Sequence, residues 1–155
     1  MFKITPFLWF DDNAEEAVNF YTSIFKNSKI LYVGRYAEGA PRPVGSVLTI
    51  DFLLEGQKFT ALNGGPVFHF TEAVSFMVDV ETQAELDDLW KNLSAGGEES
   101  QCGWLKDKFG LSWQIVPSVL GQLMNNPDPV KAANVTAALL KMKKLDIAAL
   151  QRAAQ

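Results

Sequence analysis

The sequence of residues 102–117 is CGWLKDKFGLSWQIVP, which has the pattern of two β-strands joined by a short polar turn. Residues 107–110 supply the turn, and Gly110 can adopt the positive φ that such a turn requires. The carboxylate of Asp107 is expected to cap backbone amides of the turn. The stretch therefore predicts an antiparallel hairpin near the end of the folded core.

Side chains alternate between the two faces of a strand, so the hairpin also predicts which residues face which way. Gln114 is expected on one face, and Trp113 and Ile115 on the other. Trp113 is then predicted to pack against a helix, near Leu86 or Trp90. Gln114 is predicted to form part of a pocket wall.

Two segments of the chain share the order strand, acidic turn and amphipathic helix. The first helix is predicted to follow Asp11, Asp12 and Asn13, whose side chains offer N-cap oxygens. The second follows a strand at residues 73–80 and begins with a capping box made by Thr82 and Glu85. Their apolar residues recur at helical spacing, namely Ala14, Ala17, Val18, Tyr21, Ile24 and Phe25, then Leu86, Leu89, Trp90 and Leu93.

These segments form an internal repeat, because positions 18 and 86, which differ by 68, carry corresponding apolar residues. Further strands are predicted at residues 29–36, 46–54, 57–63, 98–101, 103–106 and 112–116. The fold class is therefore α+β, with two βαβββ modules at about 1–66 and 70–118 and a helical tail at about 119–155. Paired modules would enclose a cleft between their sheets. Chance similarity between two amphipathic helices is the alternative.

Composition excludes several classes of partner. The chain has 155 residues, a formal net charge of -4 and no basic run, which argues against nucleic acid and against an acidic membrane surface. Residues 2–10 are too short to span a membrane and lack an export signal. The single cysteine, Cys102, excludes an intramolecular disulfide and fits a reducing compartment. We expect a cytoplasmic protein.

Several segments together resemble the PhnB-like branch of the vicinal oxygen chelate superfamily, which includes glyoxalase I, bleomycin-resistance proteins and extradiol dioxygenases. They are residues 12–21, 62–66, 73–76, 102–104 and 114–117. Members of this branch are often labelled 3-demethylubiquinone-9 3-methyltransferase-like. The resemblance covers nearly the whole chain and implies a glyoxalase-like sandwich of paired modules and a homodimer.

The resemblance also implies four positions at which relatives hold a divalent metal. Here these positions carry Thr5, Ala73, Phe59 or a near neighbour, and Gln114. Only Gln114 can ligate, and one amide oxygen does not hold a transition metal against water. We therefore expect no metal and no cofactor. The alternative role of Gln114 is a buried amide that bonds to neighbouring strands.

The methyltransferase label finds no support in the residues, because no Gly-rich loop connects a strand to a helix. Strand parity instead predicts a mainly apolar and aromatic lining, which suits a small organic ligand. These side chains could also simply fill the cleft. The pocket candidates are Thr5, Phe7, Trp9, Asn63, Ser75, Met77, Cys102, Ser112 and Gln114.

Two further residues and the tail complete the expectations. His69 is predicted in a loop, as a loop or dimer contact, and Cys102 is either a reactive thiol or a buried structural one. Asp128 and Pro129 begin a helix in which Val130, Ala133, Ala137 and Leu140 follow at helical spacing, and Asp146 begins a short last helix. The tail is predicted to cover the sandwich or to clasp a second subunit.

Two function classes remain open. The first is a metal-independent protein that binds a small, partly apolar or aromatic metabolite. The second is a metal-independent enzyme, such as an isomerase or lyase acting on a quinone-like metabolite, which would require a carboxylate, thiol or amide beside the substrate.

Overall fold

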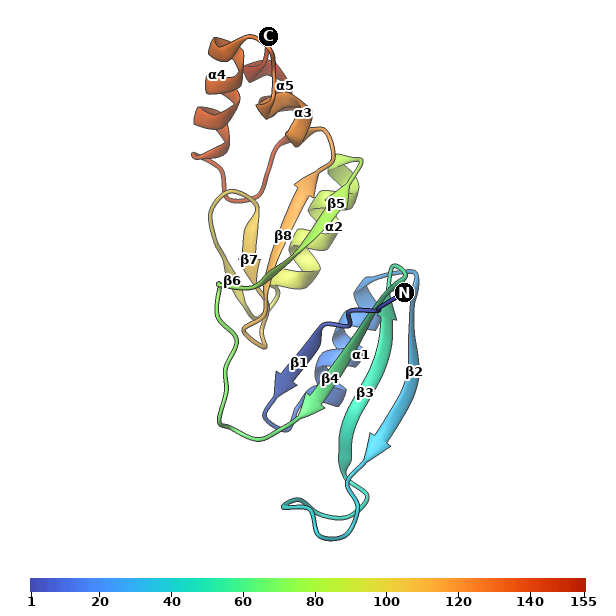
Figure 1. Cartoon of the computed structure of the whole chain (residues 1–155). Helices are drawn as coiled ribbons and strands as arrows, with labels where there is room; N and C mark the ends of the chain where they lie inside the picture. The colour runs from blue at the N-terminus through green and yellow to red at the C-terminus, as the bar shows by residue number, and fades with distance from the viewer. The chain divides into compact units, whose positions relative to one another are not determined.

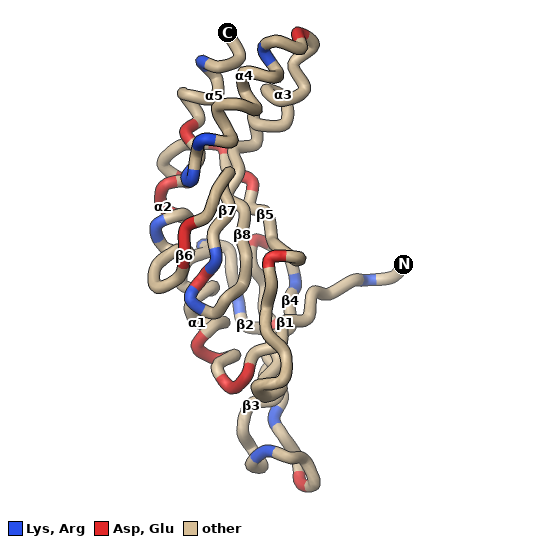
Figure 2. The backbone as a smooth tube through the Cα atoms, turned by 90° about the vertical axis from the view of Figure 1, so that its left-hand side faces the viewer, with Lys and Arg blue, Asp and Glu red and all other residues tan.

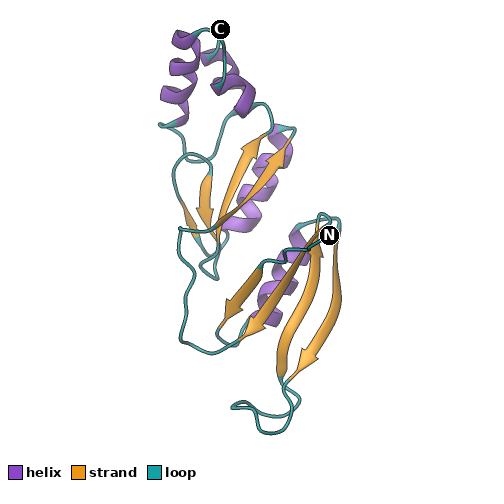
Figure 3. Cartoon of the chain, viewed as in Figure 1, coloured by secondary structure: helices purple, strands orange, loops and turns teal.

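A computed structural model describes all 155 residues of the chain. The backbone divides into two compact units, Met1–His69 and Phe70–Gln155 (Figure 1). Each unit contains a four-stranded mixed sheet with one long helix on one face (Figure 3). We call the opposite side of each sheet its open face.

The first unit has the predicted βαβββ order. Its elements are β1 (Phe7–Phe10), α1 (Ala14–Ile24), β2 (Ser28–Arg35), β3 (Val47–Leu54) and β4 (Gln57–Asn63). The strand order is β1-β4-β3-β2, with β1 parallel to β4 and the other neighbours antiparallel. Three aromatic rings join helix to sheet, because Tyr21 of α1 stacks on Phe52 and Phe52 stacks on Phe59. Phe59 therefore belongs to the helix-facing core.

The first strand does not include the pocket candidate Thr5. It begins at Phe7, so Thr5 precedes it, and Phe2 and Ile4 are exposed. Pro6 still takes part at the margin of the sheet, since its carbonyl accepts a hydrogen bond from the amide of Thr60 at 3.0 Å.

The cap of α1 differs from the prediction. Asn13 occupies the N-cap position, but its side chain makes no capping hydrogen bond. The amide of Ala14 instead donates to Oδ1 of Asn63, at the end of β4, over 2.9 Å. Asn63 Nδ2 donates in turn to Glu15 Oε1 and to the carbonyl of Val47. A single buried amide thus ties the start of α1 to two strands.

The second unit repeats this module and adds three helices. Its elements are β5 (Ser75–Val80), α2 (Gln83–Ser94), β6 (Glu98–Glu99), β7 (Trp104–Lys106), β8 (Ser112–Pro117), α3 (Leu120–Met124), α4 (Pro129–Leu139) and α5 (Ile147–Ala153). The strand order is β5-β8-β7-β6, with β5 parallel to β8. The tail helices lie beyond the carboxyl ends of β5 and β8 (Figure 1). The short helix α3 was not predicted.

The predicted hairpin is confirmed. The strands β7 and β8 pair antiparallel, and Gly110 has φ 88°. Asp107 is buried, and its Oδ1 accepts hydrogen bonds from the amides of Phe109 at 2.8 Å and Leu111 at 3.1 Å. Its Oδ2 accepts a further hydrogen bond from Trp113 Nε1 at 2.9 Å. The turn is thereby fastened to the helix-facing core.

The capping box of α2 is also confirmed, with Thr82 and Glu85 each accepting from the other's backbone amide. Beneath α2, the helix-facing side of the sheet carries Leu105, Trp113 and Ile115, which are all buried. The predicted alternation around Gln114 is therefore correct.

The tail is anchored to the second module by hydrogen bonds. Gln83 of α2 donates to the carbonyl of Leu145 at 3.0 Å and accepts from the amide of Ile147 at 2.9 Å. The amides of Cys102 and Gly103 donate to the carbonyls of residues 142 and 143. None of the helices combines the length and apolar character that a membrane crossing needs.

The helix α4 begins as predicted, with Asp128 as N-cap and Pro129 in the first turn. Its predicted apolar stripe does not form the packing side, however. Val130 and Leu140 are 65% and 64% exposed, whereas Val135 is fully buried. The helix therefore packs through the side that contains Val135.

Candidate functional site

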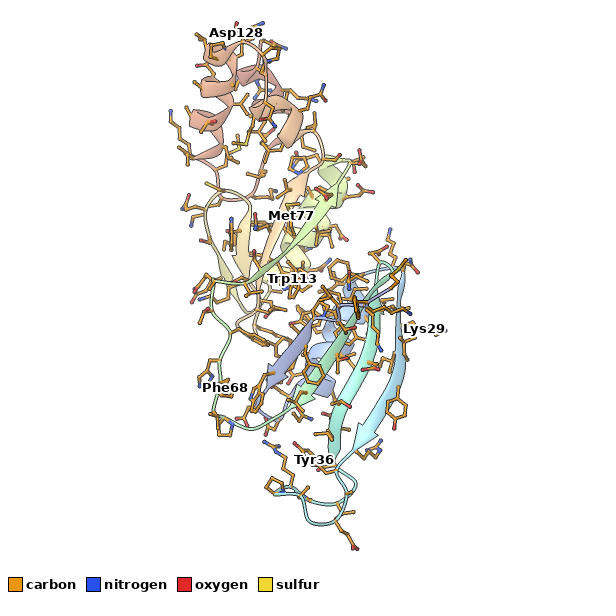
Figure 4. All side chains as sticks on the ribbon, viewed as in Figure 1. Lys29, Tyr36, Phe68, Met77, Trp113 and Asp128 are labelled. Atoms are coloured by element: carbon orange, nitrogen blue, oxygen red, sulfur yellow. The ribbon has the colours of Figure 1, made fainter.

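The open face of the second sheet brings together most of the predicted site residues of that unit. The strand register places Met77, Gln114 and Trp104 in one row across β5, β8 and β7. The adjacent row holds Ser75, Ser112 and Lys106. Met77, labelled in Figure 4, is 57% exposed. This face thus combines apolar side chains with an amide and two hydroxyls.

Gln114 is held by a neighbouring strand. Its Nε2 donates to Ser75 Oγ over 2.9 Å, so the amide is oriented and its carbonyl oxygen is left as an acceptor. Ser112, the register partner of Ser75, is 1% exposed, and its Oγ has no hydrogen-bond partner. An unpaired buried hydroxyl is uncommon and requires an explanation, such as a bound water.

Charged residues of both signs lie along β6 and β7 (Figure 2). Lys106 of β7 forms an ion pair with Glu72. The hydrogen bond from Lys106 lowers the pKa of Glu72 below its ordinary value, and the same contact raises the pKa of Lys106. Lys106 thus remains protonated near neutral pH and unsuited to act as a base.

The open face of the first sheet is more aromatic. Its register places Trp9, Leu62 and Thr49 in one row and Phe7, Thr60 and Asp51 in the next. Phe7 is 59% exposed.

The acidic residue of this face is already occupied. Thr60 Oγ1 donates to Asp51 over 2.7 Å, and Lys58 Nζ lies 3.0 Å from the same carboxylate. The Thr60 hydrogen bond and then Lys58 lower the pKa of Asp51, while partial burial acts in the opposite direction. The carboxylate is therefore ionised and paired near neutral pH.

A glycine loop closes over Trp9. The indole Nε1 donates to the carbonyl of Gly65 at 2.9 Å. The ring of Phe68, labelled in Figure 4, is edge-on to the indole, and the two ring centroids lie 4.9 Å apart. A Cβ on Gly64 would lie 2.4 Å from the indole, so only glycine allows this approach. The loop also receives a hydrogen bond from Tyr36, whose hydroxyl donates to the carbonyl of Asn63. The indole is thereby fixed at the edge of the open face.

Three further residues singled out from the sequence lie outside the two open faces. Asn63 lies on the helix-facing side, where it caps α1. Cys102 lies in the turn before β7 with φ 58°, half-buried against the tail. His69 is exposed in the loop between the two units, as expected for a loop residue.

The residues present do not fit a divalent metal site. The two modules align by strand register, since Phe7 faces Thr60 as Ser75 faces Ser112. The counterpart of Gln114 is consequently Leu62 rather than Phe59, whose ring faces the helix. Across the chain, no three His, Cys, Asp or Glu side chains lie close enough to hold a metal ion.

The connections from strand to helix do not resemble a nucleotide-type cofactor site either. The β1-to-α1 connection is Asp11-Asp12-Asn13, and the β5-to-α2 connection is Glu81-Thr82. Neither contains a glycine that would let a cofactor approach the backbone, and the acidic side chains would repel phosphate or carboxylate groups.

A surface groove of about 570 Å³ lies between α2 and α5 in the second unit, and no residue of the open face of that unit's sheet lines it. Its lining includes Gln83, Asp87 and Lys144, which already bond to each other or to the backbone. None of the predicted site residues lines it.

Sequence reasoning missed Trp104 and Lys106 on the second open face and Leu62 on the first. Strand parity could have identified the two hairpin residues, since both lie opposite β8 residues of known parity. Leu62 required the register between β1 and β4, which the sequence does not contain.

Comparisons with known proteins agree with this geometry. The sequence matches the family described as 3-demethylubiquinone-9 3-methyltransferase over residues 2–116. The chain is similar to the PhnB protein from Bacillus cereus, described as a 3-demethylubiquinone-9 3-methyltransferase, at 39% identity and a TM-score of 0.69. That similarity covers 76% of this chain and 100% of that one.

Two more distant structures share the fold alone. A glyoxylase/bleomycin resistance protein/dioxygenase domain from Frankia sp. EAN1pec has 17% identity and a TM-score of 0.50, covering 76% of this chain and 92% of that one. The fosfomycin resistance protein FosX from Listeria monocytogenes has 16% identity and a TM-score of 0.54, covering 79% and 97%. No curated protein matches the chain.

Proposed function

The chain belongs to the 3-demethylubiquinone-9 3-methyltransferase family, in the PhnB-like branch of the glyoxalase/bleomycin resistance/dioxygenase superfamily, and we propose from this premise that it binds a small, partly apolar or aromatic metabolite without a metal ion. The binding surface is the open face of the second sheet around Gln114. Trp9 and Phe7 on the first sheet offer a similar aromatic surface.

The oriented amide of Gln114 carries this proposal. Its Nε2 donates to Ser75 Oγ, and the exposed Met77 and the ring of Trp104 flank it in the same row. A ligand donor could bond to the Gln114 carbonyl, whereas the buried Ser112 hydroxyl lies out of reach of a ligand on this face. The apolar remainder of the ligand would then cover Met77 and Trp104.

A hydroxylated aromatic probe tests the proposal directly. We expect 1-naphthol to bind the wild type in isothermal titration calorimetry and to quench tryptophan fluorescence. Gln114→Leu should weaken binding by about 3–10-fold, since it removes one hydrogen bond. Gln122→Leu, which changes an exposed glutamine of α3, is the matched control. Absence of binding, or equal weakening by the control, would contradict the proposal.

Divalent metals are expected neither to co-purify with the protein nor to stabilise it. A metal at 100-fold excess over its Kd would add about 2.7 kcal/mol to the free energy of unfolding. This gain would raise the melting temperature by several degrees. Elemental analysis and thermal melts with Zn²⁺, Ni²⁺, Mn²⁺ and Mg²⁺ provide the check. A shift that Gln114→Ala abolishes would restore a metal-dependent function.

Methyl transfer is not part of the proposal, because the acidic connections described above do not suit a nucleotide-type cofactor. The second candidate function is a metal-independent isomerase or lyase acting on a quinone-like metabolite. Lys106 of the second open face is already paired with Glu72, so catalysis on this face would fall to Asp79, an exposed carboxylate on the same side of β5 as Met77.

The proposal includes a homodimer. Large apolar side chains remain exposed on the open faces, among them Phe7, Tyr32 and Met77, and a second copy would bury part of this surface.

A further inference from the structure

One carboxylate of the second open face has no partner in the chain. Asp79 follows Met77 by two positions on β5, so both side chains lie on the same side of the sheet. Asp79 is exposed, and it takes part in none of the side-chain hydrogen bonds and ion pairs of the chain. The proposed binding surface therefore carries a carboxylate that no neighbouring side chain neutralises.

The one basic residue of this sheet lies too far away to compensate Asp79. Among the four strands only β7 carries a basic residue, Lys106, and the register places it two strands and two rows from Asp79. A strand spacing of about 4.8 Å and a rise of about 3.3 Å per residue put the two Cα atoms roughly 16 Å apart, beyond the Debye length of about 8–10 Å. Lys106 is also paired with Glu72 already. The sheet thus leaves Asp79 without a compensating charge.

The amide of Gln114 adds a second acceptor beside Asp79. Gln114 pairs with Met77 in the strand register, so Asp79 lies one row beyond it on the neighbouring strand. The same strand dimensions place the Cα atoms of Asp79 and Gln114 about 8 Å apart. The Nε2 group of Gln114 donates to Ser75, which leaves the carbonyl oxygen for a ligand. A ligand group located between the two side chains can therefore donate to both.

These two acceptors favour a ligand group that carries several donors and a positive charge. A primary ammonium group has three N–H donors, no acceptor and a unit charge. A hydrogen bond from a cation to a carboxylate is about twice as strong as one between neutral groups. The indole of Trp104, which follows Gln114 in the same row, is an aromatic ring that also attracts cations. An anionic ligand would instead be repelled by Asp79.

We propose that the ligand of this surface is an aromatic or apolar ammonium compound. Its cationic group lies between Asp79 and the Gln114 carbonyl, and its apolar part covers Met77 and Trp104. This inference rests on the proposed function and narrows its ligand class. Asp79 then serves as the counter-ion of the ligand rather than as a catalytic base.

Three probes that share a naphthalene ring separate the effect of charge from that of shape. At neutral pH 1-naphthylmethylamine is a cation, because primary amines titrate at about pH 10, whereas 1-naphthalenemethanol is neutral and 1-naphthoate is an anion. We expect isothermal titration calorimetry on the full chain to show that the amine binds about 3–10-fold more tightly than the alcohol. The naphthoate should bind more weakly than the alcohol.

Asp79→Asn is the variant that tests the counter-ion, since it keeps the size of the side chain and removes its charge. The ratio of the affinities for the amine and the alcohol should fall to near unity. Asp88→Asn is the matched control, because it removes an equal charge from an exposed carboxylate of α2, on the other side of the sheet. The control should keep the wild-type ratio.

The outcomes distinguish this proposal from the proposed function. If the alcohol binds and Gln114→Leu weakens its binding, but the amine has no advantage, the cationic ligand is wrong and the binding surface stands. An equal fall of the ratio in Asp79→Asn and Asp88→Asn would also overturn the proposal, because the preference would then come from the net charge of the chain. If none of the three probes binds, the binding surface itself is wrong and this proposal fails with it.

Discussion

Replacing Trp113 with alanine is expected to lower the free energy of unfolding by about 3–5 kcal/mol, which is a large part of the stability of a domain of this size. The side chain is 3% exposed, and its ring centroid lies 5.8 Å from that of Phe76. The substitution opens a cavity beneath α2 and removes the hydrogen bond from the indole to Asp107. Urea denaturation followed by circular dichroism measures the change.

Trp104→Ala provides the control, because Trp104 is half-buried on the open face of the same sheet. Trp104→Ala should lower the free energy of unfolding clearly less than Trp113→Ala, since the side chain of Trp104 is already partly hydrated. A loss below about 1 kcal/mol for Trp113→Ala would contradict the packing described here.

The second large effect is expected for Asp107. Its carboxylate accepts three hydrogen bonds, from two turn amides and from the indole of Trp113, and the residue is 2% exposed. Asp107→Ala leaves these buried donors unpaired, and each unpaired donor costs about 1–3 kcal/mol. We expect a total loss of about 3–5 kcal/mol in chemical denaturation, because water can reach part of the opened turn.

Asp107→Asn separates the contributions. The amide oxygen can still accept from the two turn amides, but its NH₂ group cannot accept from the indole. The stability of Asp107→Asn should therefore lie between that of the wild type and that of Asp107→Ala. Equal stability of Asp107→Ala and wild type would show that the turn does not depend on this carboxylate.

The open faces could be predicted in large part, because parity along one strand is a local property. Trp9 and Gln114 lie on the faces that the alternation predicted. The assignment of these and the other candidates to one binding pocket stays a prediction, as do the module boundaries. Asn63 shows the limit of such reasoning, since its amide is taken up by the start of α1, 49 residues away in sequence.

By itself, the sequence determined the features that neighbouring residues produce. The Asp107–Gly110 turn, the Thr82–Glu85 capping box and the Asp128–Pro129 helix start each depend on contacts within a few residues. The internal repeat followed from the same local patterns occurring twice.

Only the tertiary structure decided which side of α4 is buried. One apolar side contains Ala132, Val135 and Leu139, and the other contains Val130 and Leu140. Helical periodicity identifies both sides but does not rank them, because both offer similar apolar surface. The choice depends on which side α3 and α5 meet, and that contact is made by residues distant in sequence. The same reason explains Leu62, whose place opposite Trp9 depends on the register between two strands about fifty residues apart.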